Sequence, residues 1–301
     1  MKPRILFFLI FFLALSVINF GAIYSYGSLE SNILEERVLE HLRTTAQSRA
    51  NHIEDFISEH KSQVLIAATH QELSNEELRE IKKISGSFYE IFVLDSNGKI
   101  ITSSEESHIG EDKSGDDYFV NVIKEGYVKN AYYSETTKFY FIAISVPQGE
   151  NILVAKIKLD LLDEITRDRN GLGETGEVYF INKEGYMLSS SRFKEGVILR
   201  EKVDGQGARQ CFEPHGQEEY HKAIEYKDYR DISVYGVYYK INEFDWCVLV
   251  EIDKAEIQGK IRGDNCFELL ITSLGVSFGV VILGLLFWIL VLGRGRKKKR
   301  K

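Results

Sequence analysis

The sequence contains an internal repeat, and this repeat restricts the possible folds more than any other feature of the chain. Residues 90–104 align without a gap with residues 177–191, at an offset of 87 residues. Each copy has the pattern of a strand, a tight turn at Asn97-Gly98 or Glu184-Gly185, and a second strand. We therefore predict that the chain contains the same β-hairpin twice.

A second, weaker match follows each hairpin and extends the repeat to a whole module. Residues 139–146 and 152–159 have the pattern of two strands joined by a turn, which residues 234–241 and 247–253 share. At the end of this match the offset is 95 residues, so the second copy carries a net insertion. Two units with the same order of elements indicate two copies of one module. We predict an α+β fold in which each module is an antiparallel sheet with flanking helices.

Two long apolar segments lie on either side of the repeat. Residues 5–27 and 269–293 are each long enough to cross a bilayer core, which takes about 20 helical residues. We predict that both are transmembrane helices. A cleaved signal peptide is the alternative for the first segment, although its apolar part is longer than a usual signal core. Gly275 and Gly279 have the spacing of a helix-packing pair, which is compatible with a homodimer.

The charges at the two ends predict an orientation. Residues 1–4, which include Lys2 and Arg4, and the basic tail 294–301 are expected in the cytoplasm. The main domain would then be extracytoplasmic, with residues 259–268 connecting it to the second membrane helix of a two-pass cell-membrane protein. We expect the tail to contact anionic membrane lipid. The formal net charge is −7 although both ends are basic, so the acidic middle argues against nucleic-acid binding.

A long stretch without proline or glycine precedes the first hairpin. Its apolar residues recur mostly three or four positions apart, which places them on one face of a helix. We predict a stalk helix over residues 28–70 that packs on its own domain, with contacts to a second copy near the membrane. The apolar positions are Leu29, Ile33, Leu34, Val38, Leu42, Ala46, Ala50, Ile53, Ile57 and Val64.

Motifs that suggest catalysis or cofactor binding do not have the context that they require. Residues 171–176 match the string Gly-x-Gly-x-x-Gly, but a dinucleotide site needs a strand before it and a helix after it. Here a helical stretch precedes the string and a strand follows it, so we interpret it as a loop between the modules. The seven histidines are scattered without the spacing of a metal site. We predict no enzyme activity, no cofactor and no metal.

Two cysteines of the second module are candidates for a disulfide. An oxidising extracytoplasmic environment permits such bonds. Our hypothesis is that Cys211 and Cys247 pair and close the inserted loop, and two buried free thiols are the alternative. Cys266 lies at the predicted membrane boundary, where it would bridge two protomers or remain a free thiol.

Short motifs recur in a fixed order along both modules. In the first module they are residues 95–98, 109–110, 117–119 and 145–147, and in the second they are residues 171–177, 182–187, 226–230, 245–247 and 251–253. In their order and spacing these motifs resemble the double Cache sensor family, in which two tandem PAS-like domains follow a long N-terminal helix between two transmembrane helices. The resemblance covers about residues 28–258. It implies a membrane-distal module over residues 71–160 and a membrane-proximal module over residues 161–258, which we call the distal and the proximal module.

The resemblance also implies that a small extracytoplasmic ligand binds in the distal module. In amino-acid-binding members an arginine holds the ligand carboxylate and an aspartate holds its ammonium. The nearest positions here are Asp116 and Lys156, whose charges are inverted. We therefore expect Lys156 to select a carboxylate or a similar anion. The expected pocket walls are Tyr118, Tyr132 or Tyr133, and Tyr140.

Receptors of this family usually continue into a signalling module, whereas this chain continues for about eight residues after the second apolar segment. We expect a separate signalling protein to read the ligand-bound state. Two alternatives stay open at this point. One is an anchored solute-binding protein for a transporter, and the other is a surface structural protein that has this fold without a ligand.

Overall fold

The computed structural model describes residues 3–122, 125–213, 223–241 and 244–260, together with scattered positions between 271 and 286. The chain forms two compact units. One unit, Leu39–Lys254, contains both sheets, and the other comprises Met1–Val38 and Ala255–Lys301.

The structure leaves the membrane predictions open. Among the described residues, no helix has both the length and the apolar character that a membrane span requires. The second predicted segment, 269–293, lies largely outside the described residues, and the basic tail 294–301 lies wholly outside them.

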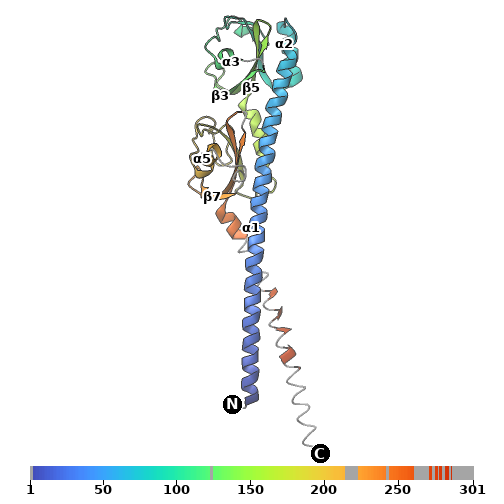
Figure 1. Ribbon diagram of the computed structural model, residues 1–301, viewed down its shortest axis with the longest axis vertical. Coiled ribbons are helices and arrows are strands. Elements are labelled where there is room, and N and C mark those ends of the chain that lie inside the picture. The colour runs from blue at the N-terminus through green and yellow to red at the C-terminus, as the bar shows by residue number, and fades with distance from the viewer. Residues whose placement is uncertain are drawn as a thin grey trace, which may run out of the picture. The chain divides into compact units, whose positions relative to one another are not determined.

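Helix α1 runs from Pro3 to Ala67, so it begins well before the predicted stalk helix. Within the Leu39–Lys254 unit it lies along both modules (Figure 1). The apolar face that the spacing predicts is confirmed for this unit, because these side chains have no exposed surface. They are Leu42, Ala46, Ala50, Ile53, Ile57 and Val64.

Helix α2 (Asn75–Ser85) has both of its ends specified by the local sequence. The Ser74 side chain accepts a hydrogen bond from the backbone N–H of Glu77, whose carboxylate accepts one from the backbone N–H of Ser74. This capping box satisfies two donors that the first helical turn leaves free. At the other end Gly86 adopts φ 68°, a left-handed conformation that glycine reaches without strain.

The distal module contains a five-stranded antiparallel sheet in the order β2-β1-β5-β4-β3. Its strands are β1 (Phe88–Leu94), β2 (Ile100–Ser103), β3 (Tyr127–Tyr133), β4 (Tyr140–Gln148) and β5 (Asn151–Lys158). The predicted first hairpin forms β1 and β2. Its turn requires Gly98, which has φ 82° and whose added Cβ would lie 2.6 Å from Cα of Ser114.

Helices cover the two faces of this sheet differently. Helices α1 and α2 lie on one side of it, and the short helices η1 (Glu106–His108) and α3 (Asp117–Val120) belong to the loops that follow β2 (Figure 1). The ring of His60 on α1 lies 5.6 Å from the ring of Phe88 on β1. Tyr118 of α3 packs instead with Phe92 and Ala143, so α3 covers the opposite face.

The connection between the modules is attached to α1. It comprises η2 (Leu159–Leu161), α4 (Leu162–Arg167) and a loop. Arg49 donates hydrogen bonds to the carboxylate and to the carbonyl of Asp168, each at 3.0 Å. Gly171, with φ 78°, lies so close to α1 that an added Cβ would be 2.3 Å from Nε2 of His41. The Gly-x-Gly-x-x-Gly string is therefore the inter-module loop that the sequence predicts.

The proximal module contains a four-stranded antiparallel sheet in the order β6-β9-β8-β7. Its elements are β6 (Glu177–Asn182), α5 (Gln206–Phe212), β7 (Ile224–Lys227), β8 (Ser233–Ile241) and β9 (Trp246–Asp253). The second strand of the predicted hairpin is reduced to isolated bridges, one of them between Ile181 and Met187. This segment still bonds to β6, because the N–H of Leu188 donates to the carbonyl of Phe180 at 2.7 Å. On its other side the backbone of Met187 bonds to Glu201 and Leu199 of the following loop.

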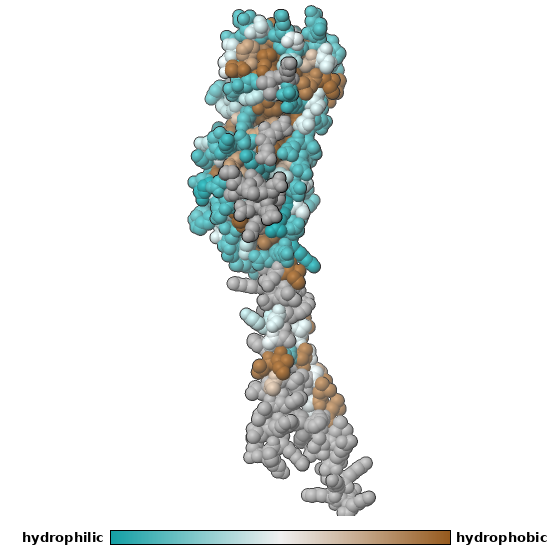
Figure 2. Space-filling view, in the orientation of Figure 1, coloured by the Kyte–Doolittle hydropathy of each residue, from teal (hydrophilic) through white to brown (hydrophobic). Residues whose placement is uncertain are grey.

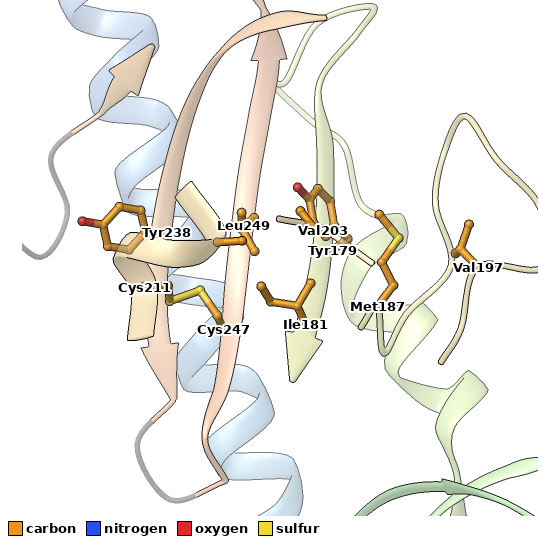
Figure 3. Close-up of a cluster of buried hydrophobic side chains, with 10 residues drawn as sticks. Tyr179, Ile181, Met187, Val197, Val203, Cys211, Tyr238, Cys247 and Leu249 are labelled. Carbon is orange, nitrogen blue, oxygen red and sulfur yellow. A yellow bond between two sulfur atoms is a disulfide. The ribbon is translucent and has the colours of Figure 1, made fainter. Parts of the chain in front are cut away.

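A disulfide joins Cys211 on α5 to Cys247 on β9 inside the proximal core (Figure 3). The Cα atoms of this pair, which the sequence hypothesis names, lie 6.4 Å apart, and both residues are fully buried. The bond attaches α5 to the sheet. The buried cluster around it contains Tyr179, Ile181, Met187, Val197, Val203, Ala208, Tyr238 and Leu249.

Hydrophilic side chains cover most of the described surface that Figure 2 shows for the two modules. Hydrophobic side chains that are exposed in the distal module and at the adjoining end of α1 are spread over several elements. They include Ile66, Ile84, Ile101 and Ile109.

Candidate functional site

Five residues define one face of the distal sheet, which we call the site face. They are Glu90 and Phe92 on β1, Val154 and Lys156 on β5, and Ala143 on β4. Residues directly opposite each other in an antiparallel ladder project to the same side of the sheet. The register pairs Glu90 with Lys156, Phe92 with Val154, and Ala143 with Lys156, so all five share this face.

Glu90 is the centre of a buried hydrogen-bonded group on the site face. Its carboxylate accepts a hydrogen bond from Nζ of Lys156 at 3.0 Å and lies 2.7 Å from Nδ1 of His108. Burial opposes ionisation of this carboxyl, but the charge of Lys156 and the hydrogen bond with His108 outweigh burial and lower its pKa. Glu90 and Lys156 are therefore a paired carboxylate and ammonium, and their side chains are 0% and 10% exposed.

A second charged group surrounds Asp116, immediately before α3. Its carboxylate accepts hydrogen bonds from the hydroxyl of Tyr118 at 2.8 Å and from Nζ of Lys129 at 3.0 Å. The Lys129 ammonium lies 5.1 Å from the ring centroid of Tyr118 and 4.3 Å from that of Tyr132. These distances are within the range of a cation–π interaction.

Phe92 connects the two charged groups. Nζ of Lys156 lies 5.0 Å from its ring centroid, and the Tyr118 ring meets it edge-on at 6.0 Å. The site face thus carries one continuous set of two ion pairs and three aromatic rings. We call this set the distal site: Glu90, Phe92, His108, Asp116, Tyr118, Lys129, Tyr132 and Lys156.

A bulge in β3 brings Lys129 and Tyr132 to the same face. Lys129 pairs with Ala143 and Tyr132 pairs with Phe141, so three steps along β3 correspond to two steps along β4. In a regular strand, residues three positions apart project to opposite faces. The extra residue of the bulge reverses this alternation and places both side chains on the site face.

The hydroxyl of Tyr132 is buried and has no hydrogen-bond partner in the part of the chain that the structure describes. Burial raises the pKa of this phenol, so the group is a neutral donor at physiological pH. A buried hydroxyl without a partner costs about 1–3 kcal/mol. The side-chain hydroxyl of Ser145, which faces the same side on β4, is a second buried group without a described partner.

The structure brings three of the five predicted ligand-binding residues together and separates the other two from them. Tyr118, Tyr132 and Lys156 belong to the distal site. Tyr133 and Tyr140 pair with each other one step beyond the Tyr132–Phe141 pair, so they project from the opposite face. Their rings lie 5.1 Å apart. The prediction that Lys156 holds an anion now has to include Glu90, which already neutralises that charge.

Four residues of the distal site were not assigned a role from the sequence: Glu90, Phe92, His108 and Lys129. Glu90 and Phe92 lie in the repeated segment 90–104, but repetition alone marks structure as readily as function. Glu90 and Lys156 are 66 residues apart in the chain, and they meet only because β1 pairs with β5. Such long-range register cannot be read from one sequence, and the local signal for Lys129 is hidden by the bulge.

Two other features of the described chain differ from the distal site. Among the described residues, no group of three or more His, Cys, Asp or Glu side chains is arranged to hold a metal ion. A surface hollow of about 460 Å³ lies along α1 and lacks the paired charges and aromatic rings of the distal site. Its lining is Thr44, Gln47, Ser48, Asn51, His52 and Asp55.

A family model described as Cache domain matches residues 30–261, which include both modules. No curated protein sequence matches this chain. The match spans well over half of the chain, and its range contains both the distal site and the proximal core.

Solved structures with the same fold include sensory domains. The ligand-binding domain of the Campylobacter jejuni chemoreceptor Tlp3 in complex with L-valine is 14% identical, with a TM-score of 0.58 over 76% of this chain and 97% of that chain. The extracellular domain of the histidine kinase soHK1S-Z6 is 15% identical, with a TM-score of 0.55 over 75% and 98%. The ligand binding domain of Mlp24 with asparagine is 16% identical, with a TM-score of 0.51 over 77% and 98%. At these identities the likeness concerns the fold.

Proposed function

This chain belongs to the Cache domain family, and on that premise we propose that its distal module is an extracytoplasmic sensor for a small organic acid. Cache domains are sensor domains rather than enzymes, and their ligands meet them outside the cytoplasm. The distal site is the part of this chain whose chemistry fits a ligand.

The observation that carries the proposal is the hydroxyl of Tyr132. It is a buried donor without a described partner, and it lies at the end of a cluster that holds two ammonium groups. An acceptor on a bound molecule would remove the cost of leaving this donor unpaired. The site is therefore better suited to a molecule that accepts hydrogen bonds than to one that only donates them.

The charges of the site favour a carboxylate as that acceptor. An ammonium has three N–H donors, so Lys156 and Lys129 retain donors after pairing with Glu90 and Asp116. A carboxylate that accepts from Tyr132 and from a lysine would form charge-assisted hydrogen bonds. The amino acids named with Tlp3 and Mlp24 each carry a carboxylate, which agrees with this chemistry.

A thermal-shift screen of the purified full chain tests the proposal. The panel should contain organic acids, amino acids, amines and neutral sugars. A ligand at 100 times its Kd adds about 2.7 kcal/mol to the free energy of unfolding. At about 2–4 °C per kcal/mol for a unit of this size, that corresponds to a rise in Tm of roughly 5–11 °C. We expect acids to raise Tm. A response to amines alone would contradict the assignment, and no response to any class would favour the ligand-free structural alternative.

We further propose that residues 5–27 and 269–293 anchor the protein in the cell membrane with the Leu39–Lys254 unit outside. The apolar composition of both segments and the basic residues at both ends support this arrangement. A protease added to intact cells should then degrade the Leu39–Lys254 unit. Protection of this unit until the cells are lysed would show that the orientation is wrong. The separate signalling protein stays a prediction.

A further inference from the structure

One of the two residues in the β3 bulge makes a hydrogen bond to the other module. Asn130 lies between Lys129 and Tyr132, and its side-chain oxygen accepts a hydrogen bond from Nε1–H of Trp246 at 2.6 Å. The same oxygen accepts one from the backbone N–H of Ala131 at 2.8 Å, which fixes the side chain over the bulge. One amide oxygen therefore connects the bulge to the proximal module.

Trp246 is a rigid donor. It is fully buried at the start of β9, in register with Asn182 on β6 and with Ile241 on β8. The next residue, Cys247, is fixed to α5 by the disulfide. An indole N–H can only donate, and an unpaired buried donor costs about 1–3 kcal/mol. Asn130 thus supplies the acceptor for the indole N–H of Trp246. In return, the buried Trp246 side chain fixes the position of Asn130.

The bulge lies on a strand whose register is weakly constrained. β3 is an edge strand, paired only with β4. Without the bulge, Ala131 would pair with Phe141 and would take the site face, and Tyr132 would turn to the other face. A one-residue slip would therefore replace a tyrosine hydroxyl in the distal site by a methyl group.

We propose that the hydrogen bond between Trp246 and Asn130 holds β3 in its bulged register, so that Trp246 and Asn130 are positioning residues for the distal site. This inference rests on the proposed ligand-binding function of that site. Ligand binding to Tyr132 also favours the bulged register, because coupling between two sites is reciprocal. Occupancy of the distal site therefore strengthens the contact with β9 of the proximal module.

Thiol labelling in the full chain tests the register without any ligand. The variants Tyr132→Cys and Tyr133→Cys are made in a Cys266→Ser background, and each thiol is labelled with an uncharged maleimide under non-reducing conditions. In the bulged register position 133 is the exposed one, with 37% exposure for Tyr133. We expect Tyr133→Cys to label faster than Tyr132→Cys.

The change that tests the hydrogen bond is Asn130→Leu, which keeps the size of an exposed side chain and removes the acceptor. A neutral hydrogen bond contributes about 0.5–1.5 kcal/mol, so labelling of Tyr132→Cys should accelerate by about 2- to 10-fold. Asn130→Asp keeps the acceptor oxygen and should label like the parent. Trp246→Phe keeps an aromatic ring and removes the donor, so it should change labelling in the same direction as Asn130→Leu.

Two results would overturn the inference. One is a labelling rate of Tyr132→Cys that does not change when Asn130→Leu is added. The other is an equal change of this rate in Asn130→Asp and in Asn130→Leu. Neither depends on finding a ligand. If no ligand is found but labelling changes as expected, the proposed function is rejected and the control of the register by Asn130 stands. If a ligand is found but labelling does not change, only the control of the register is rejected.

Discussion

Glu177 and Glu251, two buried carboxyl groups, lie directly opposite each other on β6 and β9. The repeat places Glu90 and Lys156 at the equivalent positions of the distal module, where they also lie opposite each other. The proximal module therefore has a carboxyl group where the distal module has an ammonium.

A proton takes the place of the missing positive charge. One oxygen of Glu251 accepts hydrogen bonds from the hydroxyls of Tyr179 at 2.8 Å and Tyr226 at 2.6 Å. Burial, with the nearby carboxylates of Asp228 and Glu177, outweighs these hydrogen bonds and raises the pKa of Glu251 to about 8. Glu251 is therefore mostly protonated at neutral pH in the folded protein.

This difference predicts that the protein loses stability as the pH rises. The folded pKa of Glu251 is about 8 and its ordinary value is 4.5, so its contribution is complete below pH 4.5 and is lost as the pH rises to about 8. Glu251→Gln should remove a slope of up to about 1.4 kcal/mol per pH unit. Urea unfolding between pH 5 and pH 8 measures this slope. The exposed control Glu184→Gln should retain it, and an unchanged slope in Glu251→Gln would contradict the assignment.

Lys156 should matter for stability as well as for ligand binding. Lys156→Met leaves the Glu90 carboxylate buried without its main partner, and breaking a buried ion pair costs about 3–5 kcal/mol. Combining it with Glu90→Gln should restore part of the loss, because the double variant has no buried unpaired charge. Chemical denaturation measures each value. Lys158→Met, two residues away on β5, serves as the control and should cost much less.

The sequence predicted the elements that depend on local or periodic signals. The buried face of α1 follows from its spacing, and the turn at Gly98 follows from the Asn-Gly pair. The faces of Tyr132 and Tyr133 could not be assigned, because the β3 bulge has no glycine or proline to mark it. The partner of Lys156 was also hidden, since Glu90 reaches it only through the pairing of β1 with β5.

The disulfide predicts a clear redox response. Reduction, or Cys211→Ala together with Cys247→Ala, should lower the free energy of unfolding by about 2–4 kcal/mol. On a non-reducing gel the parent should migrate faster than the reduced chain, and Cys266→Ala should leave this difference intact. If both thiols are alkylated without a reductant, the pair does not form in solution.

The inter-module loop should be sensitive to the size of residue 171. Gly171→Ala introduces both a left-handed alanine and a clash with His41, whereas Gly110→Ala introduces only the left-handed alanine, because nothing lies near its Cβ. We expect Gly171→Ala to lower Tm more than Gly110→Ala does. His41→Ala should reduce the cost of Gly171→Ala by removing the clash. Equal Tm losses for the two glycine variants would show that the loop does not approach α1 this closely.

The most direct test of the ligand-binding account is the affinity of one acid identified in the screen for Tyr132→Phe and for Tyr133→Phe, measured by isothermal titration calorimetry. The two variants each remove one hydroxyl from neighbouring residues on opposite faces of β3. If the Tyr132 hydroxyl donates to the ligand, Tyr132→Phe should weaken binding by about 10-fold or more, as expected for a lost hydrogen bond to a charged group. Tyr133→Phe should leave the affinity unchanged. Equal affinities for both variants and the parent would contradict the placement of the ligand in the distal site.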